Sequence, residues 1–294
     1  MVLAGSKAHD ADFYDGILEY NPMLRKWIQG VLDEDIGRGD ITSAYIVQKA
    51  HRASASLISR GRGILSGINV FKMVYEELGV SLKWDFFHSD GDRLGEGDKI
   101  CKFEGPALGI VVGERTALNI LQQMSGIATY TDVLVQKISH TKARVVDTRK
   151  TIPGMRILSK YAVRTGGGVN HRFGLDDSVL IKDNHIAAAG GIREAVDRIR
   201  KLAPFTVGVE VEASCPREVQ EALECKVDII MLDNMEIDLM REMVQLIGNN
   251  ALIEASGDIN EHNITAVAET GVDFISVGAL THSCKAFNIS LVLE

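Results

Sequence analysis

Nine lysine and arginine residues gather in one stretch of an otherwise acidic chain, between residues 142 and 185. The same stretch holds only four aspartates, although the whole chain carries a net charge of −8. Converging cations repel one another unless an anion lies between them, and the arginine fork binds carboxylates and phosphates through paired hydrogen bonds. The cluster therefore predicts a site for a small polyanion that carries two carboxylates, or a carboxylate and phosphates.

Four of these cations stand where a binding site would need them. Arg149, Lys150 and Lys182 follow apolar runs, and Arg172 follows the glycines at 166–168. A solvated helix face is the plain alternative for any run of charge. Because few of the nine residues are spaced as neighbours on a helix, we favour the site.

Two carboxylates and two glycine segments close later apolar runs. Glu212 and Asp233 end neighbouring runs, and their oxygens suit Mg²⁺ shared with phosphates or the hydroxyls of a ribose. A salt bridge in a loop is the alternative for either one alone. The segments ASG at 255–257 and SVGA at 276–279 offer backbone N–H groups of the kind that hold a phosphate, although glycine at a tight turn has the same appearance.

These residues end short apolar runs that alternate with helical segments, which is the rhythm of βα units. The last three intervals between run ends are 21, 23 and 22 residues. Ligands bind at the carboxyl ends of parallel strands, both in an α/β barrel and in a doubly wound sheet. Six strands are visible, and a seventh is expected near 161–168. The polar strand ends are Asp147, Lys182, Glu212, Asp233, Ser256 and Gly278.

The N-terminal part of the chain has a different pattern. Alternating runs between glycine clusters over 53–113 indicate strands and turns, with one helix near Val70–Leu78. Apolar spacing predicts helix within 14–31. We expect the charged segment 33–42 to be an ordered loop that enters a strand.

A change of pattern near residue 116 suggests a domain boundary. We expect an α+β domain over 1–116 and a βα-repeat domain over 117–284, which begins with a long helix. Residues 285–294 have the composition of one more strand, which is expected to return to the first domain.

Composition excludes several classes of protein. A chain of 294 residues with 46% hydrophobic and 24% charged residues is expected to be globular, and its acidity disfavours nucleic acid and anionic membranes as partners. It has no apolar run long enough for a membrane span or a signal peptide. The four cysteines show no CxxC spacing, so we expect free thiols and a cytoplasmic location.

The block DTRKTIPGMRILSKYAVRTGGGVNHRFGLDDSVLIKDNH at 147–185 resembles the central signature of the quinolinate phosphoribosyltransferases, also called carboxylating nicotinate-nucleotide pyrophosphorylases. Other blocks match in order along most of the chain: DIGRGDIT (35–42), ERTALNILQQMSGIAT (114–129), VEVE (209–212), LDN (232–234), EASGDI (254–259) and SVGALTHS (276–283). Small departures occur at Ile152, Met155 and Thr165, and none of them removes a charged position.

The resemblance implies a reaction, a fold and an assembly. Quinolinate and 5-phosphoribosyl-1-pyrophosphate (PRPP) would give nicotinate mononucleotide, pyrophosphate and carbon dioxide with Mg²⁺, in de novo NAD biosynthesis. The fold would be α/β, with an N-terminal α+β open sandwich domain and an incomplete α/β barrel of about seven strands. The assembly would be a homodimer with shared active sites, or a higher assembly of such dimers.

The resemblance also assigns roles to residues. For quinolinate it implies Arg115, donated by the neighbouring subunit, with Arg149, His171, Arg172 and Lys182. For PRPP it implies Thr148, Lys150, Glu212, Asp233, Ser256, Gly257, Gly278 and Ala279. Lys150, Lys182, Glu212 and Asp233 would serve catalysis, with Glu212 and Asp233 on the Mg²⁺ side, either directly or through the substrate.

Other functions are also compatible with these residues. Lys182 at a strand end is where a Schiff-base aldolase would hold its lysine, although the surrounding arginines exceed what a neutral aldehyde needs. A non-catalytic sensor of phosphosugars would show the same charges without turnover. A related transferase that acts on another base is a further alternative.

Overall fold

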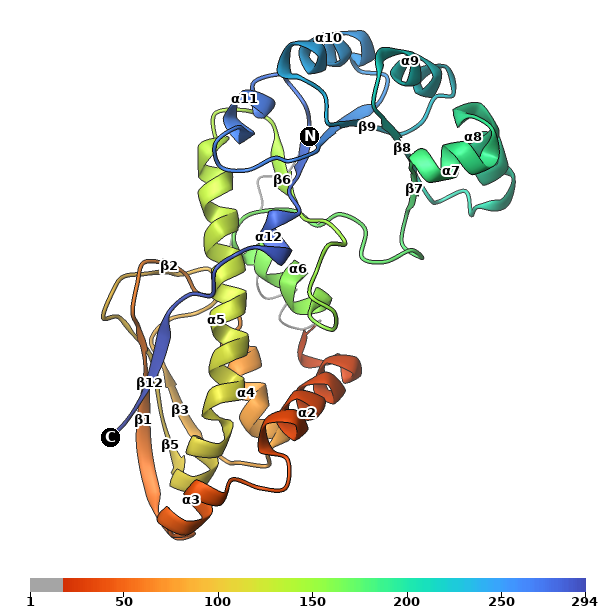
Figure 1. Cartoon of the computed structure of the whole chain (residues 1–294). Coiled ribbons are helices and arrows are strands. Elements are labelled where there is room, and N and C mark those ends of the chain that lie inside the picture. The colour runs from red at the N-terminus through yellow and green to blue at the C-terminus, as the bar shows by residue number, and fades with distance from the viewer. Residues whose placement is uncertain (1–17) are drawn as a thin grey trace. The chain divides into compact units, whose positions relative to one another are not determined.

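The computed structural model describes residues 18–294, which form two compact units (Figure 1). The first unit comprises the described residues up to Tyr130, together with 153–167 and 284–294. The second comprises 131–152 and 168–283. The expected boundary after residue 116 falls within one helix, α5 (Ala107–Lys137). The domain bounds expected from the sequence stay a prediction.

The first unit is built on a four-stranded antiparallel sheet in the order β12–β1–β5–β3. Its last strand along the chain, β12, pairs with β1 from Ala55 opposite Leu293 to Ser59 opposite Ile289. Residues near the end of the sequence therefore supply an outer strand of the N-terminal sheet. The strands are β1 (Arg52–Ser59), β3 (Lys83–Phe86), β5 (Lys99–Pro106) and β12 (Ile289–Leu293), with a small pair β2 (Gly63–Ile64) and β4 (Arg93–Leu94) beside them.

The segment expected as a loop entering a strand, 33–42, is helical at both ends, so that prediction was wrong. Helix α2 (Pro22–Ile36) continues to Ile36 and ends at Gly37, and α3 (Ile41–Ile46) begins after Asp40. The Asp40 carboxylate accepts from the backbone N–H of Ser43 at 2.9 Å and so caps the new helix. The expected helix within 14–31 lies partly outside the described residues, which begin at residue 18.

Helix α4 (Ile68–Glu77) lines an aromatic core with the antiparallel sheet. Phe71 and Tyr75 on α4 contact Trp84 of β3 and Phe103 of β5, and the ring centroids of Trp84 and Phe103 are 4.6 Å apart. Phe71 has no exposed surface, and Phe103 is 1% exposed. Tilted and edge-on rings of this kind add to the stability from burial alone.

The second unit is a six-stranded parallel sheet in the order β6–β11–β10–β9–β8–β7. The first strand, β6 (Arg144–Val146), lies beside the last, β11 (Phe274–Ser276), so the sheet curls round on itself. Between them run β7 (Val179–Ile181), β8 (Val209–Ala213), β9 (Ile229–Asp233) and β10 (Leu252–Ser256). The expected α/β class, with an N-terminal α+β domain and an incomplete barrel, is confirmed, and the structure adds that the N-terminal sheet is antiparallel.

The seventh strand, expected near 161–168, is reduced to a single bridge at Val169, directly after that range. Residues 156–165 form helix α6 (Arg156–Thr165) of the first unit, and a single parallel bridge at Val169 pairs with Val146. The strand pairings of the described residues leave the ring open between Val169 and β7.

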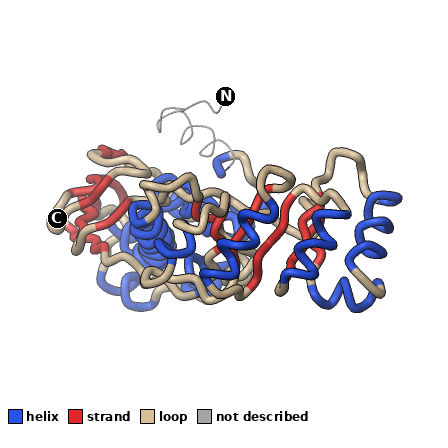
Figure 2. The backbone as a smooth tube through the Cα atoms, turned by 90° about the horizontal axis from the view of Figure 1, so that it is seen from above, coloured by secondary structure: helices blue, strands red, loops and turns tan. Residues whose placement is uncertain are grey.

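Helices alternate with the strands of the second unit, as Figure 2 shows. They are α7 (Asp183–Ala189), α8 (Ile192–Leu202), α9 (Pro216–Glu224), α10 (Ile237–Ile247), α11 (Ile264–Ala268) and α12 (Ala279–His282). Each longer helix buries one apolar stripe, such as Ile192, Ala195 and Val196 on α8. In the described part of the chain, no helix combines the length and apolarity that crossing a bilayer requires.

We expect Phe71→Ala to destabilise the protein by about 3–5 kcal/mol, because it opens a cavity among fully buried rings. Phe87→Ala is the matched control: Phe87 is 50% exposed, and its truncation should change stability by less than about 0.5 kcal/mol. Urea unfolding measures both free energies. Similar losses in the two variants would contradict this account of the core.

Candidate active site

The register of the parallel strands directs a row of polar side chains to one face of the sheet. Glu210 and Glu212 are two residues apart on β8 and so share a face. Met231 of β9 is in register with Glu212 on one side and with Glu254 of β10 on the other, so Glu254 lies on the same face. Asp233 lies opposite Ser256. Three neighbouring strands thus send charged or hydroxyl groups to the same side.

The polar residues expected at strand ends are at strand ends. Asp147 and Lys182 directly follow β6 and β7, and Glu212, Asp233 and Ser256 are among the last two residues of their strands. Gly278 follows β11 by two residues. Because the strands are parallel, these ends meet at one edge of the barrel, where ligands bind in this architecture.

The charge cluster divides between the units. Arg156, Lys160 and Arg164 lie on α6 of the first unit at four-residue spacing, so these three share a helix and do not stand at strand ends. Lys160 is 4% exposed, so the helix does not present them as a solvated face. Arg149, Lys150, Arg172 and Lys182 belong to the second unit. Arg115 is exposed on α5 in the first unit.

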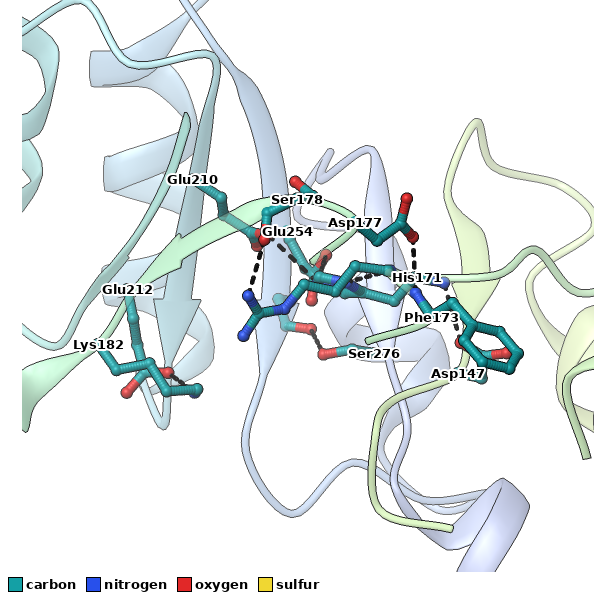
Figure 3. A network of polar contacts seen from close by, with 12 residues as sticks. Asp147, His171, Phe173, Asp177, Ser178, Lys182, Glu210, Glu212, Glu254 and Ser276 are labelled. Carbon is teal, nitrogen blue, oxygen red and sulfur yellow. Dashed lines mark hydrogen bonds and ion pairs between the residues drawn. The ribbon is translucent and has the colours of Figure 1, made fainter. Parts of the chain in front are cut away.

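Lys182 forms an ion pair with Glu212, shown in Figure 3. The side chain of Glu212 is 15% exposed and that of Lys182 is 43% exposed, so the pair is partly shielded from water. A cation expected to hold one substrate and an anion expected to hold the other therefore neutralise each other. This ion pair engages the amine that a Schiff-base enzyme needs free to attack a carbonyl, which disfavours the Schiff-base alternative.

The turns after β9 and β10 lock together around Gly257. The backbone N–H of Asn234 donates to the carbonyl of Ser256 at 2.9 Å, and its side-chain amide donates to Asp233 Oδ2 at 2.7 Å. Gly257 has a φ of 105°, and a Cβ there would overlap the Asn234 side chain and lie 2.8 Å from the Asn234 nitrogen. Only glycine allows this approach, which sets the position of Asp233. Asn234 was not selected from the sequence.

Thr148, Lys150 and Gly278 meet at the neighbouring strand ends. The backbone N–H of Lys150 donates to Thr148 Oγ1 at 3.0 Å, and the hydroxyl of Thr281 donates to the Lys150 carbonyl at 2.7 Å. A Cβ on Gly278 would lie 3.1 Å from Lys150 Cδ. Ala279, the first residue of α12, follows directly. The segments expected to hold phosphate groups are therefore adjacent.

The loop after Val169 is held by a buried aspartate. Asp147 has no exposed surface and accepts from the Asn170 side-chain amide at 2.6 Å and from the His171 backbone N–H at 2.9 Å. His171 Nδ1 in turn accepts from the backbone N–H of Arg172 at 2.7 Å. Arg172 Nη1 donates to the Ser178 carbonyl at 2.8 Å. Asp147 thus has a structural task at this strand end.

Two buried glutamates face the ring of His171 (Figure 3). His171 Nε2 lies 3.2 Å from Glu210 Oε2 and 3.6 Å from Glu254 Oε2. The glutamates are 2% and 4% exposed, and the second carboxylate oxygen of each is buried without a hydrogen-bond partner. Burial, and then the charge of Glu210, raise the pKa of Glu254, while His171 opposes the shift.

Burial and the neighbouring charge of Arg149 lower the pKa of the Arg172 guanidinium, while Glu210 and Asp177 oppose that shift. Arg149 and Arg172 are therefore close enough to repel, which is the arrangement a bound dianion would stabilise. Glu210 and Glu254 were not selected from the sequence. An acidic residue inside an apolar strand run, as in VEVE and EASG, was the available signal.

The donor sets differ in how well they suit a metal ion. His171, Glu210 and Glu254 have ligand atoms within 4.8 Å of one another. However, His171 Nδ1 accepts an N–H, so Nε2 carries the ring proton and has no lone pair for a metal. Glu212 and Asp233 offer oxygen alone, which suits Mg²⁺, and two carboxylates leave positions for substrate phosphates and water.

We expect Gly257→Ala to destabilise the protein more than Gly190→Ala. Both glycines have a left-handed φ, but a Cβ at Gly190 meets no atom within 4 Å, whereas one at Gly257 meets Asn234. The control therefore carries only the backbone cost of about 1–2 kcal/mol. Thermal unfolding compares the two. Equal losses would show that the close approach to Asn234 is unimportant.

Comparison with known proteins identifies the family. The quinolinate phosphoribosyl transferase N-terminal domain model matches residues 40–125, and the C-terminal domain model matches 127–292. A probable nicotinate-nucleotide pyrophosphorylase [carboxylating] of Bacillus subtilis is 41% identical over 91% of this chain and 92% of its own length. The Synechocystis protein of the same name is 44% identical over 87% of this chain and 88% of its own length.

Solved structures agree with the sequence matches. The nicotinate-nucleotide pyrophosphorylase from Francisella tularensis superposes with a TM-score of 0.87 at 40% identity, covering 92% of this chain and 96% of that one. The chain belongs to the quinolinate phosphoribosyl transferase family.

Proposed function

We propose that this chain transfers the phosphoribosyl group of PRPP to quinolinate with decarboxylation, giving nicotinate mononucleotide, pyrophosphate and carbon dioxide. The family is one of pentosyltransferase enzymes. Some relatives are named for the carboxylating direction and others for the decarboxylating direction of the reaction. One observation carries the assignment to this chain. Arg149 and Arg172, which suit a dicarboxylate, and Glu212 and Asp233, which suit a ribose, belong to one barrel edge.

The dicarboxylate side of the proposed site is cationic. Arg149, Arg172 and Lys182 would hold the two carboxylates of quinolinate, with Arg115 of a second subunit closing the site. Binding quinolinate would offset the repulsion between Arg149 and Arg172 and draw Lys182 from Glu212. His171, expected from the resemblance to contact quinolinate, has protein partners at both ring nitrogens, so it would have to release one of them to do so.

The PRPP side of the proposed site is formed by strand ends and glycines. Ser256, Gly257, Gly278 and Ala279 would hold the 5-phosphate through backbone N–H groups and the serine hydroxyl. Thr148 and Lys150 would face the pyrophosphate. Glu212 and Asp233 would face the ribose hydroxyls, and the locked turn at Asn234 keeps Asp233 in place for that role.

The chemistry needs charge placement more than covalent catalysis. The pyridine nitrogen attacks the anomeric carbon as pyrophosphate leaves, so positive charge develops on the ribose ring, where Glu212 and Asp233 stabilise it. Lys150 offsets the charge on the departing pyrophosphate. Once alkylated, the ring nitrogen accepts the electron pair released when the adjacent carboxylate leaves as carbon dioxide. The arginines retain the other carboxylate, and positioning supplies much of the acceleration.

We propose Mg²⁺ as the cofactor, with Glu212 and Asp233 as the residues that would hold it, directly or through PRPP. When bound, Mg²⁺ neutralises charge on the pyrophosphate leaving group. Glu212 and Asp233 offer oxygen ligands alone, which supports them as the Mg²⁺ site over the buried cluster of His171, Glu210 and Glu254. Free thiols at all four cysteines support a cytoplasmic location.

Purified protein should release carbon dioxide and mononucleotide in equal amounts from quinolinate and PRPP, and none with nicotinate or with a chelator.

Arg149→Ala and Arg172→Ala should each lower kcat/KM for quinolinate about 10- to 100-fold, because each removes a charge-assisted hydrogen bond. Arg241→Ala, at an exposed ion pair with Asp238, is the control. A folded protein that binds PRPP without turnover on any pyridine carboxylate would favour the sensor alternative.

We also propose a homodimer, or an assembly of dimers, in which Arg115 crosses to the partner's site. Arg115→Ala and Arg172→Ala should each lower kcat/KM for quinolinate at least about tenfold alone. Mixed dimers of the two should recover activity, because one of their two sites then carries neither change. Failure of mixed samples to recover activity, while subunit exchange is demonstrated by mass spectrometry, would count against a shared site.

A further inference from the structure

Glu210 and Glu254, which face His171, have no role in the proposed reaction, yet the barrel interior holds their two carboxyl groups side by side. Placing such groups side by side away from water is unfavourable unless each finds a partner. Their common partner is a single imidazole N–H, at 3.2 Å from Glu210 and 3.6 Å from Glu254. A fold that needed only stability would have apolar residues at these positions.

The hydrogen bonds of His171 fix the state of its ring. Nδ1 accepts from the Arg172 backbone N–H, so Nδ1 carries no proton and the neutral ring carries its proton on Nε2. That N–H points at the two glutamates, which supply acceptors on β8 and β10. A ring protonated on Nδ1 would set two donors against each other at 2.7 Å.

Arg172 is fixed through this ring. Its backbone N–H is held by His171 Nδ1, and its guanidinium donates to the Ser178 carbonyl at 2.8 Å. Glu210 also acts on the Arg172 guanidinium electrostatically. The order of contacts therefore runs from the glutamates to the imidazole and from the imidazole to the arginine.

We propose that Glu210 and Glu254 are positioning residues for quinolinate binding: they hold His171 as the Nε2–H tautomer, and the ring orients Arg172 toward the dicarboxylate. This inference rests on the proposed function, because it takes Arg172 as a quinolinate ligand. It assigns His171 a task inside the protein in place of direct contact with substrate.

Two double variants of matched shape test the proposal. Glu210→Gln with Glu254→Gln keeps oxygen acceptors for the Nε2–H, whereas Glu210→Leu with Glu254→Leu removes them and leaves a similar volume. The leucine pair should raise KM for quinolinate at least about tenfold, the usual effect of stranding a buried N–H. The glutamine pair should restore most of that loss. KM for PRPP should change less than about twofold in both, because the turns at Gly257 and Gly278 lie outside the cluster.

Stability separates this role from a structural one. Replacing two adjacent buried carboxyl groups with leucine relieves their repulsion, which offsets the cost of the stranded His171 N–H, so the Tm should change little while quinolinate binding weakens. Glu242→Leu, at an exposed position on α10, is the control for a glutamate-to-leucine change. An unchanged KM for quinolinate in the leucine pair, or an equal rise in both KM values, would overturn the proposal.

A spectroscopic readout does not depend on turnover. In full-length protein with ¹⁵N-labelled histidine, the His171 signals, assigned by their loss in His171→Gln, should show a neutral ring protonated on Nε2. A charged ring or an Nδ1–H ring in the wild-type protein would overturn the inference, even if the leucine pair fails to fold. An Nε2–H ring in a protein that does not turn over quinolinate would instead place the error in the proposed function.

Discussion

A polar group buried on the inner face of the parallel sheet is unfavourable unless it finds a partner inside the barrel, because no water is there to bond it. Asp147 finds two partners by accepting from Asn170 and His171, whereas each buried glutamate places one oxygen near a single imidazole N–H and keeps the other without a hydrogen bond. These internal pairings fix the loops that carry Arg149 and Arg172. The side chains of the site are held in fixed positions because the contacts that support them are buried and directional.

The exposed rim of the same edge follows a different rule. There the charges expected to bind the two substrates neutralise each other, as Lys182 does with Glu212, or repel one another, as Arg149 does with Arg172. A bound dianion and a bound pyrophosphate would replace this ion pair and this repulsion with more favourable contacts to the substrates. The rim is therefore adapted to ligands, whereas the interior is adapted to holding the rim in place.

The central sequence block shows how one contiguous motif can serve two structural tasks. Residues 153–167 belong to the first unit, where Tyr161 donates to Asp90, while the flanking residues carry the strand ends of the second. The C-terminal strand has a comparable task, because β12 pairs with β1 near the start of the chain. Each unit is thus assembled from separate stretches of sequence.

The sequence alone determined the βα rhythm, the polar strand ends and the family, because a parallel strand buried on both faces leaves an apolar run that ends where its ligand site begins. It did not reveal that Gly37 and Asp40 would separate two helices, since capping competes locally with strand propensity. Nor did it reveal that Arg156, Lys160 and Arg164 would share a helix face of the first unit. The partners of His171 were decided by tertiary structure alone: Glu210 and Glu254 lie on strands far along the chain, and only the curl of the sheet brings them to one imidazole.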